Sequence, residues 1–117
     1  MVDIELNGPS GPIGIGALID SGADCSLLNI QFAKEAGIDL TKARSGKMLG
    51  IGSEDDVYYM NVEIRLKDFP KPITVRAGFI DSDNVVALLG QAGFFDAYRI
   101  KFEKDHDTFE ISEAPKP

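Results

Sequence analysis

The chain has 117 residues, a length that fits one domain with one hydrophobic core. Hydrophobic residues make up 44% of it, as is typical of a soluble globular domain. Its 19 acidic residues outnumber its 12 Lys and Arg residues, which leaves a net charge of −7. This negative balance argues against binding to nucleic acid or to an anionic membrane surface, because both need basic residues to neutralise phosphates.

The cysteine, the histidine and the N-terminal residues narrow the class of protein further. Cys25 is the sole cysteine, so no intrachain disulfide forms and the fold does not depend on an oxidising compartment. His106 is the sole histidine, and we expect neither a metal site nor another cofactor. The N-terminus does not have the basic start and apolar stretch of a signal peptide, and no apolar run reaches the ~20 residues that span a bilayer. These features favour the cytoplasm.

Short apolar runs separated by glycines predict one β-rich domain over residues 1–113, followed by a tail at 114–117. Asn29 is a suitable N-cap for a helix over 30–36, and Gly37 can end that helix in the left-handed conformation. A helical turn is expected at 91–96. A short strand before the long strand at 57–67 would complete a β-hairpin with a glycine-rich tip. In chain order, apolar residues predict strands at 2–6, 13–19, 27–28, 57–67, 73–79, 85–89, 98–102 and 109–111, the last of which would close the fold.

The first segment that carries chemistry places a carboxylate at the end of an apolar strand. Burying an unpaired carboxylate is costly, so Asp20 at this position needs a partner or a raised pKa. Ser21 and Gly22 suit a tight turn, and Gly22 lets another backbone come close. The same pattern also fits a strand end at which Asp20 is a structural cap. The segment reads Leu18-Ile19-Asp20-Ser21-Gly22-Ala23-Asp24.

A second segment, about 70 residues after Asp20, is an apolar strand that delivers a glycine to a short helix; it reads Leu88-Leu89-Gly90. The two segments, in this order, resemble the retropepsin-like aspartic proteases, and the resemblance extends over roughly residues 2 to 111. It implies an all-β closed sandwich or barrel with one or two short helices, a flap hairpin and a two-fold homodimer. It also implies that Asp20 is the catalytic aspartate, supported by Ser21 and Gly22.

The resemblance also implies which residues contact the substrate, and it shows one position at which this chain departs from the family. Substrate would contact Gly22, Ala23 and Asp24 on the catalytic loop and Gly50, Ile51 and Gly52 at the flap tip. We expect apolar cleft walls at Leu18, Ile51, Ile80 and Val85. The family often has an arginine after the second-motif glycine, where it anchors the acidic residue that follows the catalytic turn. Gln91 occupies that position here, so an uncharged side chain faces Asp24.

Peptide hydrolysis by this chemistry needs two carboxyls that share one proton. The chain has one Asp-Ser-Gly, and the similar run Asp81-Ser82-Asp83 lacks the glycine. The second carboxyl would therefore come from Asp20 of another copy, because a two-fold axis brings identical residues together. This predicts a homodimeric aspartic endopeptidase that acts on polypeptides.

Two other interpretations remain open at this stage. The first is the same fold as a catalytically inactive or restricted module for dimerisation or peptide binding, which Gln91 favours. The second is an unrelated acidic β-domain in which Asp20 is structural. Cys25 is expected to be a small buried side chain rather than a nucleophile, because no histidine is near it in sequence.

Overall fold

A computed structural model describes residues 1–20, 22–50, 53–83, 85–95, 97–103 and 108–113 of the chain. The described residues form a mostly β fold with one regular α-helix, as the sequence predicts. The elements are β1 (Val2–Asn7), β2 (Ile13–Ile19), β3 (Ser26–Asn29), α1 (Ile30–Ala36), η1 (Leu40–Lys42), β4 (Arg44–Gly50), β5 (Ser53–Leu66), β6 (Ile73–Ile80), β7 (Ala87–Leu89), η2 (Gln91–Phe95), β8 (Tyr98–Glu103) and β9 (Thr108–Glu113).

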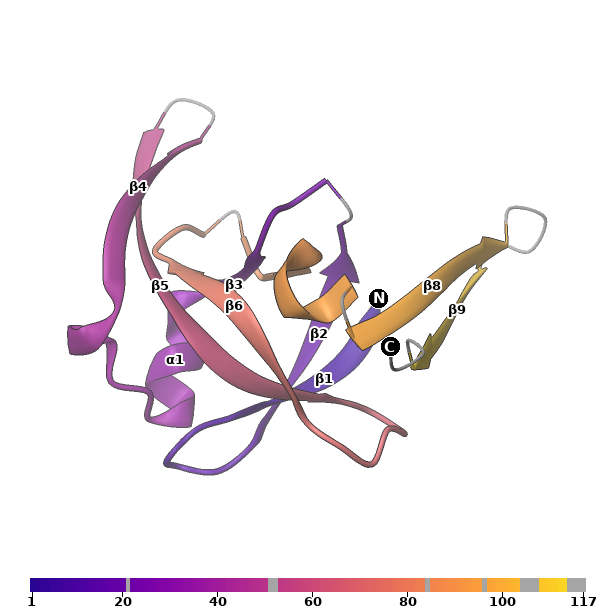
Figure 1. The fold of residues 1–117 in the computed structure, drawn as a ribbon. Coiled ribbons are helices and arrows are strands. Elements are labelled where there is room, and N and C mark those ends of the chain that lie inside the picture. The colour runs from indigo at the N-terminus through magenta and orange to yellow at the C-terminus, as the bar shows by residue number, and fades with distance from the viewer. Residues whose placement is uncertain (21, 51–52, 84, 96, 104–107, 114–117) are drawn as a thin grey trace.

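The main sheet closes into a barrel (Figure 1). Its strand order is β1-β2-β7-β3-β6-β5-β4, and β1 also pairs with β5. The β1–β5 pairing joins the two ends of the sheet, so that six strands of the described chain form a closed barrel and β4 extends β5 beyond it. This confirms the predicted closed barrel.

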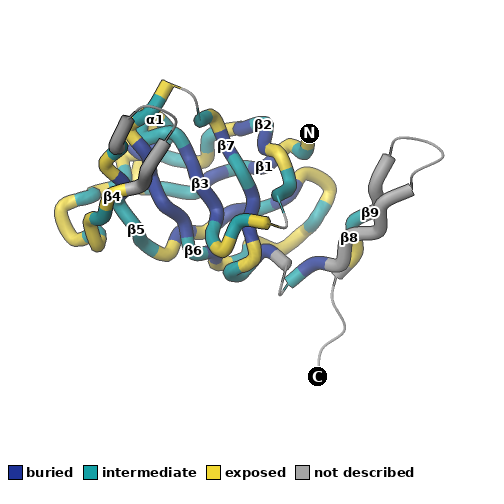
Figure 2. Tube along the Cα trace, turned by 90° about the horizontal axis from the view of Figure 1, so that it is seen from above, coloured by how far each residue is buried: buried dark blue, intermediate teal, exposed yellow. Residues whose placement is uncertain are grey.

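The barrel core is filled by the alternating apolar residues that the sequence singles out. On β5, Val62, Ile64 and Leu66 are buried and face the core, while the residues between them face outward. The short strand β3 is buried along Ser26–Leu28, because β6 and β7 pair with it on either side. Seen from above, the buried stretches of the strands lie toward the middle of the view and the exposed segments lie mostly around them (Figure 2).

Helix α1 has the bounds that its capping residues predict. The side-chain oxygen of Asn29 accepts a hydrogen bond from the backbone N–H of Gln31 at 3.0 Å. Gly37 ends the helix in the left-handed conformation, with φ of 73°. Ala33 and Ala36 are the buried residues of the helix, and their small side chains let it lie close to the barrel.

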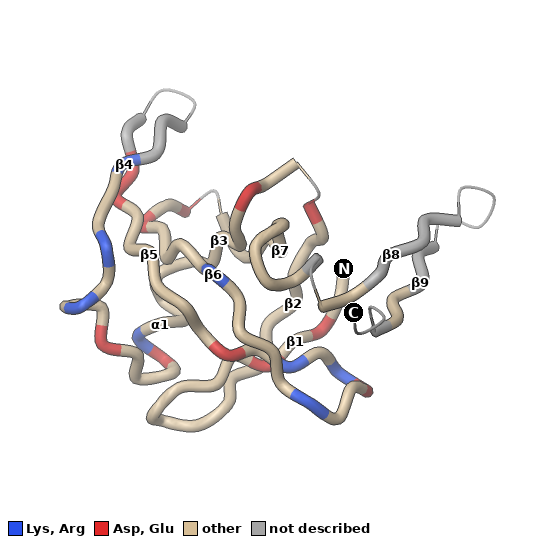
Figure 3. The backbone as a smooth tube through the Cα atoms, in the orientation of Figure 1, with Lys and Arg blue, Asp and Glu red and all other residues tan. Residues whose placement is uncertain are grey.

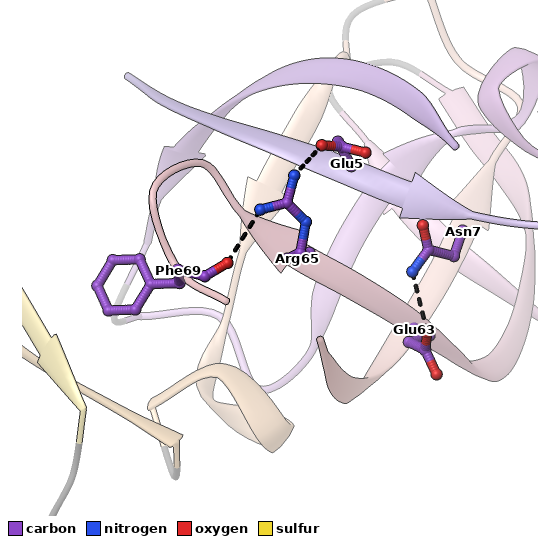
Figure 4. A network of polar contacts seen from close by, with 5 residues as sticks. All are labelled: Glu5, Asn7, Glu63, Arg65 and Phe69. Carbon is purple, nitrogen blue, oxygen red and sulfur yellow. Dashed lines mark hydrogen bonds and ion pairs between the residues drawn. The ribbon is translucent and has the colours of Figure 1, made fainter. Parts of the chain in front are cut away.

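Polar side chains cross the seam at which the barrel closes (Figure 4). Arg65 on β5 forms an ion pair with Glu5 on β1 and donates a second hydrogen bond to the backbone oxygen of Phe69 at 2.9 Å. Asn7 donates to the carboxylate of Glu63 at 2.9 Å. These contacts link the two strands on the outer face of the barrel, opposite the apolar core.

The C-terminal strands differ from the prediction, since they do not close the main sheet. Strands β8 and β9 pair with each other as a separate antiparallel hairpin that extends away from the barrel (Figures 1 and 2). Tyr98 at the start of β8 is buried against Phe69 and Phe94, with ring centroids 5.1 and 5.4 Å apart. The predicted turn at 91–96 is also irregular, because Ala92 and Gly93 interrupt η2 with non-helical backbone angles.

Candidate active site

Asp20 lies on a tight turn directly after β2. Its backbone N–H donates to the oxygen of Leu89 at 2.8 Å, and its own backbone oxygen accepts from Ala23 at 3.2 Å. Its carboxylate oxygen Oδ1 accepts from the N–H of Gly22 at 2.9 Å. The partner that this carboxylate requires is therefore a backbone amide two residues further on. Ser21, the predicted supporting residue, lies outside the described residues.

The two sequence motifs meet in the sheet, as the resemblance implies. Leu18 and Ile19 on β2 pair in parallel with Leu88 and Leu89 on β7. The parallel register places Asp20, which follows β2, beside Gly90, which follows β7. The second motif therefore lies against the turn that carries Asp20.

Gly90 permits this close approach because it has no side chain. A Cβ atom at this position would lie 2.8 Å from the backbone oxygen of Ala23 and closer still to that of Cys25. The N–H of Gly90 donates to the hydroxyl of Ser26 at 3.2 Å. Ser26 is 0% exposed, and sequence reasoning did not identify it; a serine among the apolar residues of a buried strand was the available signal.

The backbone of the second motif holds the far side of the turn. The N–H of Gln91 donates to the oxygen of Ala23, and the N–H of Ala92 donates to the oxygen of Asp24, both at 2.8 Å. These two hydrogen bonds do not depend on which side chain occupies position 91. The loop is thus anchored by backbone groups at the place where the family often has an arginine.

The loop presents a polar, acidic surface. Gly22 and Asp24 are exposed, while Asp20 and Ala23 are partly exposed. The loop between β2 and β3 carries the two carboxylates of Asp20 and Asp24 and no Lys or Arg (Figure 3). An incoming ligand can therefore reach the described residues of the loop.

An apolar cavity of about 460 Å³ lies along the strand that leads to Asp20. Leu18 and Val86, which line it, are 53% and 60% exposed, although large apolar side chains are usually buried. Leu18 and Val85 were predicted as cleft walls and do line this cavity. The sequence did not identify Val86 and Leu88 as cavity residues, because the continuous apolar run at 85–89 predicts a strand that is buried on both faces. The cavity is lined by Met1, Gly16, Leu18, Val85, Val86, Ala87 and Leu88.

Ile80 does not have its predicted place as a cleft wall. It is 2% exposed and packs in a second apolar cluster with Leu27 and Val57. Strand β6 has buried residues on both faces here, because one face packs into the barrel core and the other contacts Leu27 of β3 and Val57 of β5. Ile51, the remaining predicted wall, lies outside the described residues.

The predicted β4–β5 hairpin is present up to its tip. The two strands pair from Arg44 with Tyr59 to Gly50 with Ser53. Lys47 and Asp56 form an ion pair across the hairpin at 2.7 Å. Gly50 is thus the last predicted flap residue that the structure describes, since Ile51 and Gly52 lie outside the described residues.

Cys25 lies on the loop between β2 and β3 and is partly buried. Burial raises the pKa of its thiol above the usual 9.0, with Arg76 opposing this effect and Asp24 adding to it. A thiol with a raised pKa is poorly suited to be a nucleophile at neutral pH. Among the described residues, no three His, Cys, Asp or Glu side chains are grouped so as to hold a metal ion. The described helices include none that is long and apolar enough to cross a bilayer.

Comparison with known proteins gives two findings on structure and one on sequence. The fold is similar to a retropepsin-like aspartic protease from Rickettsia conorii, with a TM-score of 0.61, 20% identity, and coverage of 94% of this chain and 88% of that one. It is also similar to the retroviral protease-like domain of Ddi1 from Leishmania major, with a TM-score of 0.57, 16% identity, and coverage of 98% and 94%. Comparison with curated proteins gives no match. The sequence profile of the aspartyl protease family matches residues 2–92, and the chain therefore belongs to that family.

Proposed function

We propose that the protein is an aspartic endopeptidase that acts as a homodimer, with Asp20 of each subunit supplying one carboxyl of a single active site. The observation that carries this proposal is the position of Asp20, on an accessible turn that the second motif holds by backbone hydrogen bonds. A carboxylate that merely capped a strand end would not need this support from residues about 70 positions away.

In this mechanism the two Asp20 carboxyls lie ~3 Å apart and share one proton, because two like charges at that distance do not both ionise. The ionised carboxyl takes a proton from a water molecule, which attacks the carbonyl carbon of the peptide bond. The protonated carboxyl donates a hydrogen bond to the carbonyl oxygen. The C–N bond then breaks, and the carboxyl that took the proton from water passes it to the leaving amine. No covalent intermediate with the enzyme forms.

The polypeptide substrate would bind in extended form over the catalytic loop, with Gly22, Ala23 and Asp24 as backbone and side-chain contacts. Gly50, Ile51 and Gly52 of the β4–β5 hairpin would cover it as a flap and exclude water. The apolar cavity beside Leu18 and Val86 would take an apolar side chain next to the scissile bond. Ser21 would brace the catalytic loop of one subunit against that of the other.

A restricted or inactive peptide-binding module is the alternative. Its support in the sequence was the missing arginine at Gln91. The backbone hydrogen bonds from Gln91 and Ala92 to the loop weaken that support, because they anchor Ala23 and Asp24 without a charged side chain. These hydrogen bonds therefore favour an active endopeptidase over an inactive peptide-binding module.

The test is Asp20→Asn, assayed on a peptide library under mildly acidic conditions, together with sedimentation at several concentrations. We expect loss of cleavage with an unchanged dimer, because an amide is nearly isosteric with the carboxyl but neither takes a proton from water nor gives one to the leaving amine. Asp68→Asn is the matched control, since Asp68 lies at positive φ in the β5–β6 turn, a conformation that Asn also adopts readily. Unchanged proteolysis in Asp20→Asn, or a strict monomer at high concentration, would refute the mechanism. A dimer that binds peptides without cleaving them would establish the alternative.

A further inference from the structure

We propose that Asn29 is a positioning residue that holds one wall of the apolar cavity and thereby sets which substrate side chains are accepted. Val85 and Val86 line that wall; together with Ser82 and Asp83, which precede them in the sequence, they are here called the wall loop. This inference deepens the proposed function and rests on it. Asn29 is not among the residues that line the cavity, so its effect on substrate would be exerted through the wall loop.

Asn29 makes three hydrogen bonds to the wall loop. Its side-chain amide donates to the backbone oxygens of Ser82, at 3.0 Å, and Val85, at 2.9 Å. Its backbone N–H donates to the oxygen of Val86 at 2.8 Å. The last bond continues the antiparallel register in which Leu27 and Leu28 of β3 face Leu88 and Ala87 of β7. The loop is thus fastened to the barrel through one residue of β3.

The remaining side-chain atom of Asn29 is also in use. Its oxygen accepts from the N–H of Gln31 and caps α1. The two N–H donors and the carbonyl oxygen of the amide are therefore all engaged, in a partly buried position where hydrogen bonds are only partly screened by water. Serine or aspartate could cap the helix equally well, but neither carries an NH₂ group that can reach two carbonyl oxygens. The contacts to the wall loop are what require asparagine.

The fastened loop presents the apolar groups that a substrate would meet. Val85 is partly buried and Val86 is 60% exposed, and both line the cavity. The backbone N–H of Asp81, just before the loop, donates to the backbone oxygen of Asp56 on β5 at 3.2 Å. The loop is thus tied at one end to the β4–β5 hairpin and along its length to Asn29. Without the Asn29 bonds, Val85 and Val86 would no longer be held at a fixed width from Leu18.

The test compares Asn29→Ser with Asp39→Ala. Serine keeps the helix cap and removes both side-chain bonds to the wall loop. Asp39 caps η1 by accepting from the N–H of Thr41 at 2.9 Å, so Asp39→Ala controls for the effect of weakening a cap outside the wall loop. Each variant is assayed with two peptides that differ only in a bulky or small apolar residue beside the scissile bond. We expect Asn29→Ser to raise KM for the bulky peptide about tenfold with a smaller change in kcat, and to reduce the preference for it. Asp39→Ala should leave the preference unchanged.

Asn29→Asp adds a pH readout. Above its pKa the carboxylate would face the oxygens of Ser82 and Val85 and repel them. Once protonated, it can donate one hydrogen bond, so the preference should recover in part as the pH is lowered through the range in which this carboxyl titrates. A merely structural role would give no such recovery relative to wild type.

Amide hydrogen exchange separates failure of this inference from failure of the proposed function. Exchange across the wall loop should be faster in Asn29→Ser than in wild type, whether or not the wild-type protein cleaves peptides. If the wild type is inactive and exchange still rises, the proposed function fails while the structural role of Asn29 stands. If exchange and peptide preference both stay at wild-type values in a folded Asn29→Ser protein, the inference is wrong.

Discussion

The hydroxyl oxygen of Ser26 accepts a hydrogen bond from the backbone N–H of Gly90 at 3.2 Å, and Ser26 is fully buried. This contact joins β3 to the second motif directly beneath the turn that carries Asp20. It satisfies a backbone donor that has left the sheet and that water does not reach.

We expect Ser26→Ala to lower the free energy of unfolding by about 1–3 kcal/mol, the usual effect of leaving a buried donor unsatisfied. Urea denaturation measures this loss. The N–H of Gly90 should also exchange faster with solvent than in wild type. A change below about 0.5 kcal/mol, the range of ordinary surface substitutions, would mean that another group accepts this hydrogen bond.

Gly90→Ala tests the close packing of the second motif against the catalytic turn. A Cβ atom here would overlap the backbone oxygens of Ala23 and Cys25, which are parts of the main chain and cannot rotate away. We expect destabilisation by about 1–3 kcal/mol or more and loss of cleavage at temperatures where the protein is still folded. Circular dichroism and a peptide assay on the same sample separate the two effects.

Gly14→Ala is the control for that substitution. Gly14 lies on β2, its φ is not positive, and no atom lies within 4 Å of a Cβ at that position. Alanine there should be neutral or should stabilise the protein by up to about 1 kcal/mol, since it restricts the unfolded chain. Equal losses in the two variants would show that the effect of Gly90→Ala is not specific to the catalytic turn.

Local signals were enough to predict the bounds of α1 and the two motifs. Asn29 caps the helix and Gly37 ends it, and both effects depend only on neighbouring residues. The alternation along β5 likewise predicted its core-facing residues, because the period of a strand is fixed. The turn at Asp20 follows from the same kind of short-range pattern.

Contacts between distant segments were not predictable in the same way. The second role of Asn29 depends on Ser82 and Val85, which lie 53 and 56 residues away in the sequence. The burial of Ile80 depends on Leu27 and Val57 meeting it on the outer face of β6. The separate β8–β9 hairpin shows the same limit, since alternation predicts a strand but not the sheet that it joins.

Cys25 should react slowly with alkylating reagents at neutral pH. Burial disfavours the thiolate and raises the thiol pKa above 9.0, so the reactive fraction at pH 7 is smaller than for a free cysteine. The sign of the effect on stability follows. Because the thiol pKa is raised in the folded protein, ionisation of Cys25 favours the unfolded state, and stability falls as the pH rises above the usual thiol pKa of 9.0.

The alkylation rate, measured by mass spectrometry from pH 7 to pH 10, should rise steeply only above pH 9. Cys25→Ser should retain peptide cleavage, as the proposed mechanism uses carboxyls alone. Alkylation at pH 7 as fast as that of a small-molecule thiol would contradict the raised pKa. Loss of cleavage in a folded Cys25→Ser protein would contradict the role of Asp20 as the sole catalytic side chain of each subunit.

Leu18→Ser tests whether the apolar cavity receives a substrate side chain. Because Leu18 is 53% exposed, its removal from this surface should change the free energy of unfolding by less than about 0.5 kcal/mol. Its apolar contact with substrate would be lost, and we expect kcat/KM for a peptide with a bulky apolar residue to fall about tenfold or more relative to one with alanine. Competition between the two peptides in one reaction measures this ratio directly. An unchanged ratio would mean that the cavity faces away from the bound peptide, and the exposed Leu18 would then need another partner, such as the second subunit.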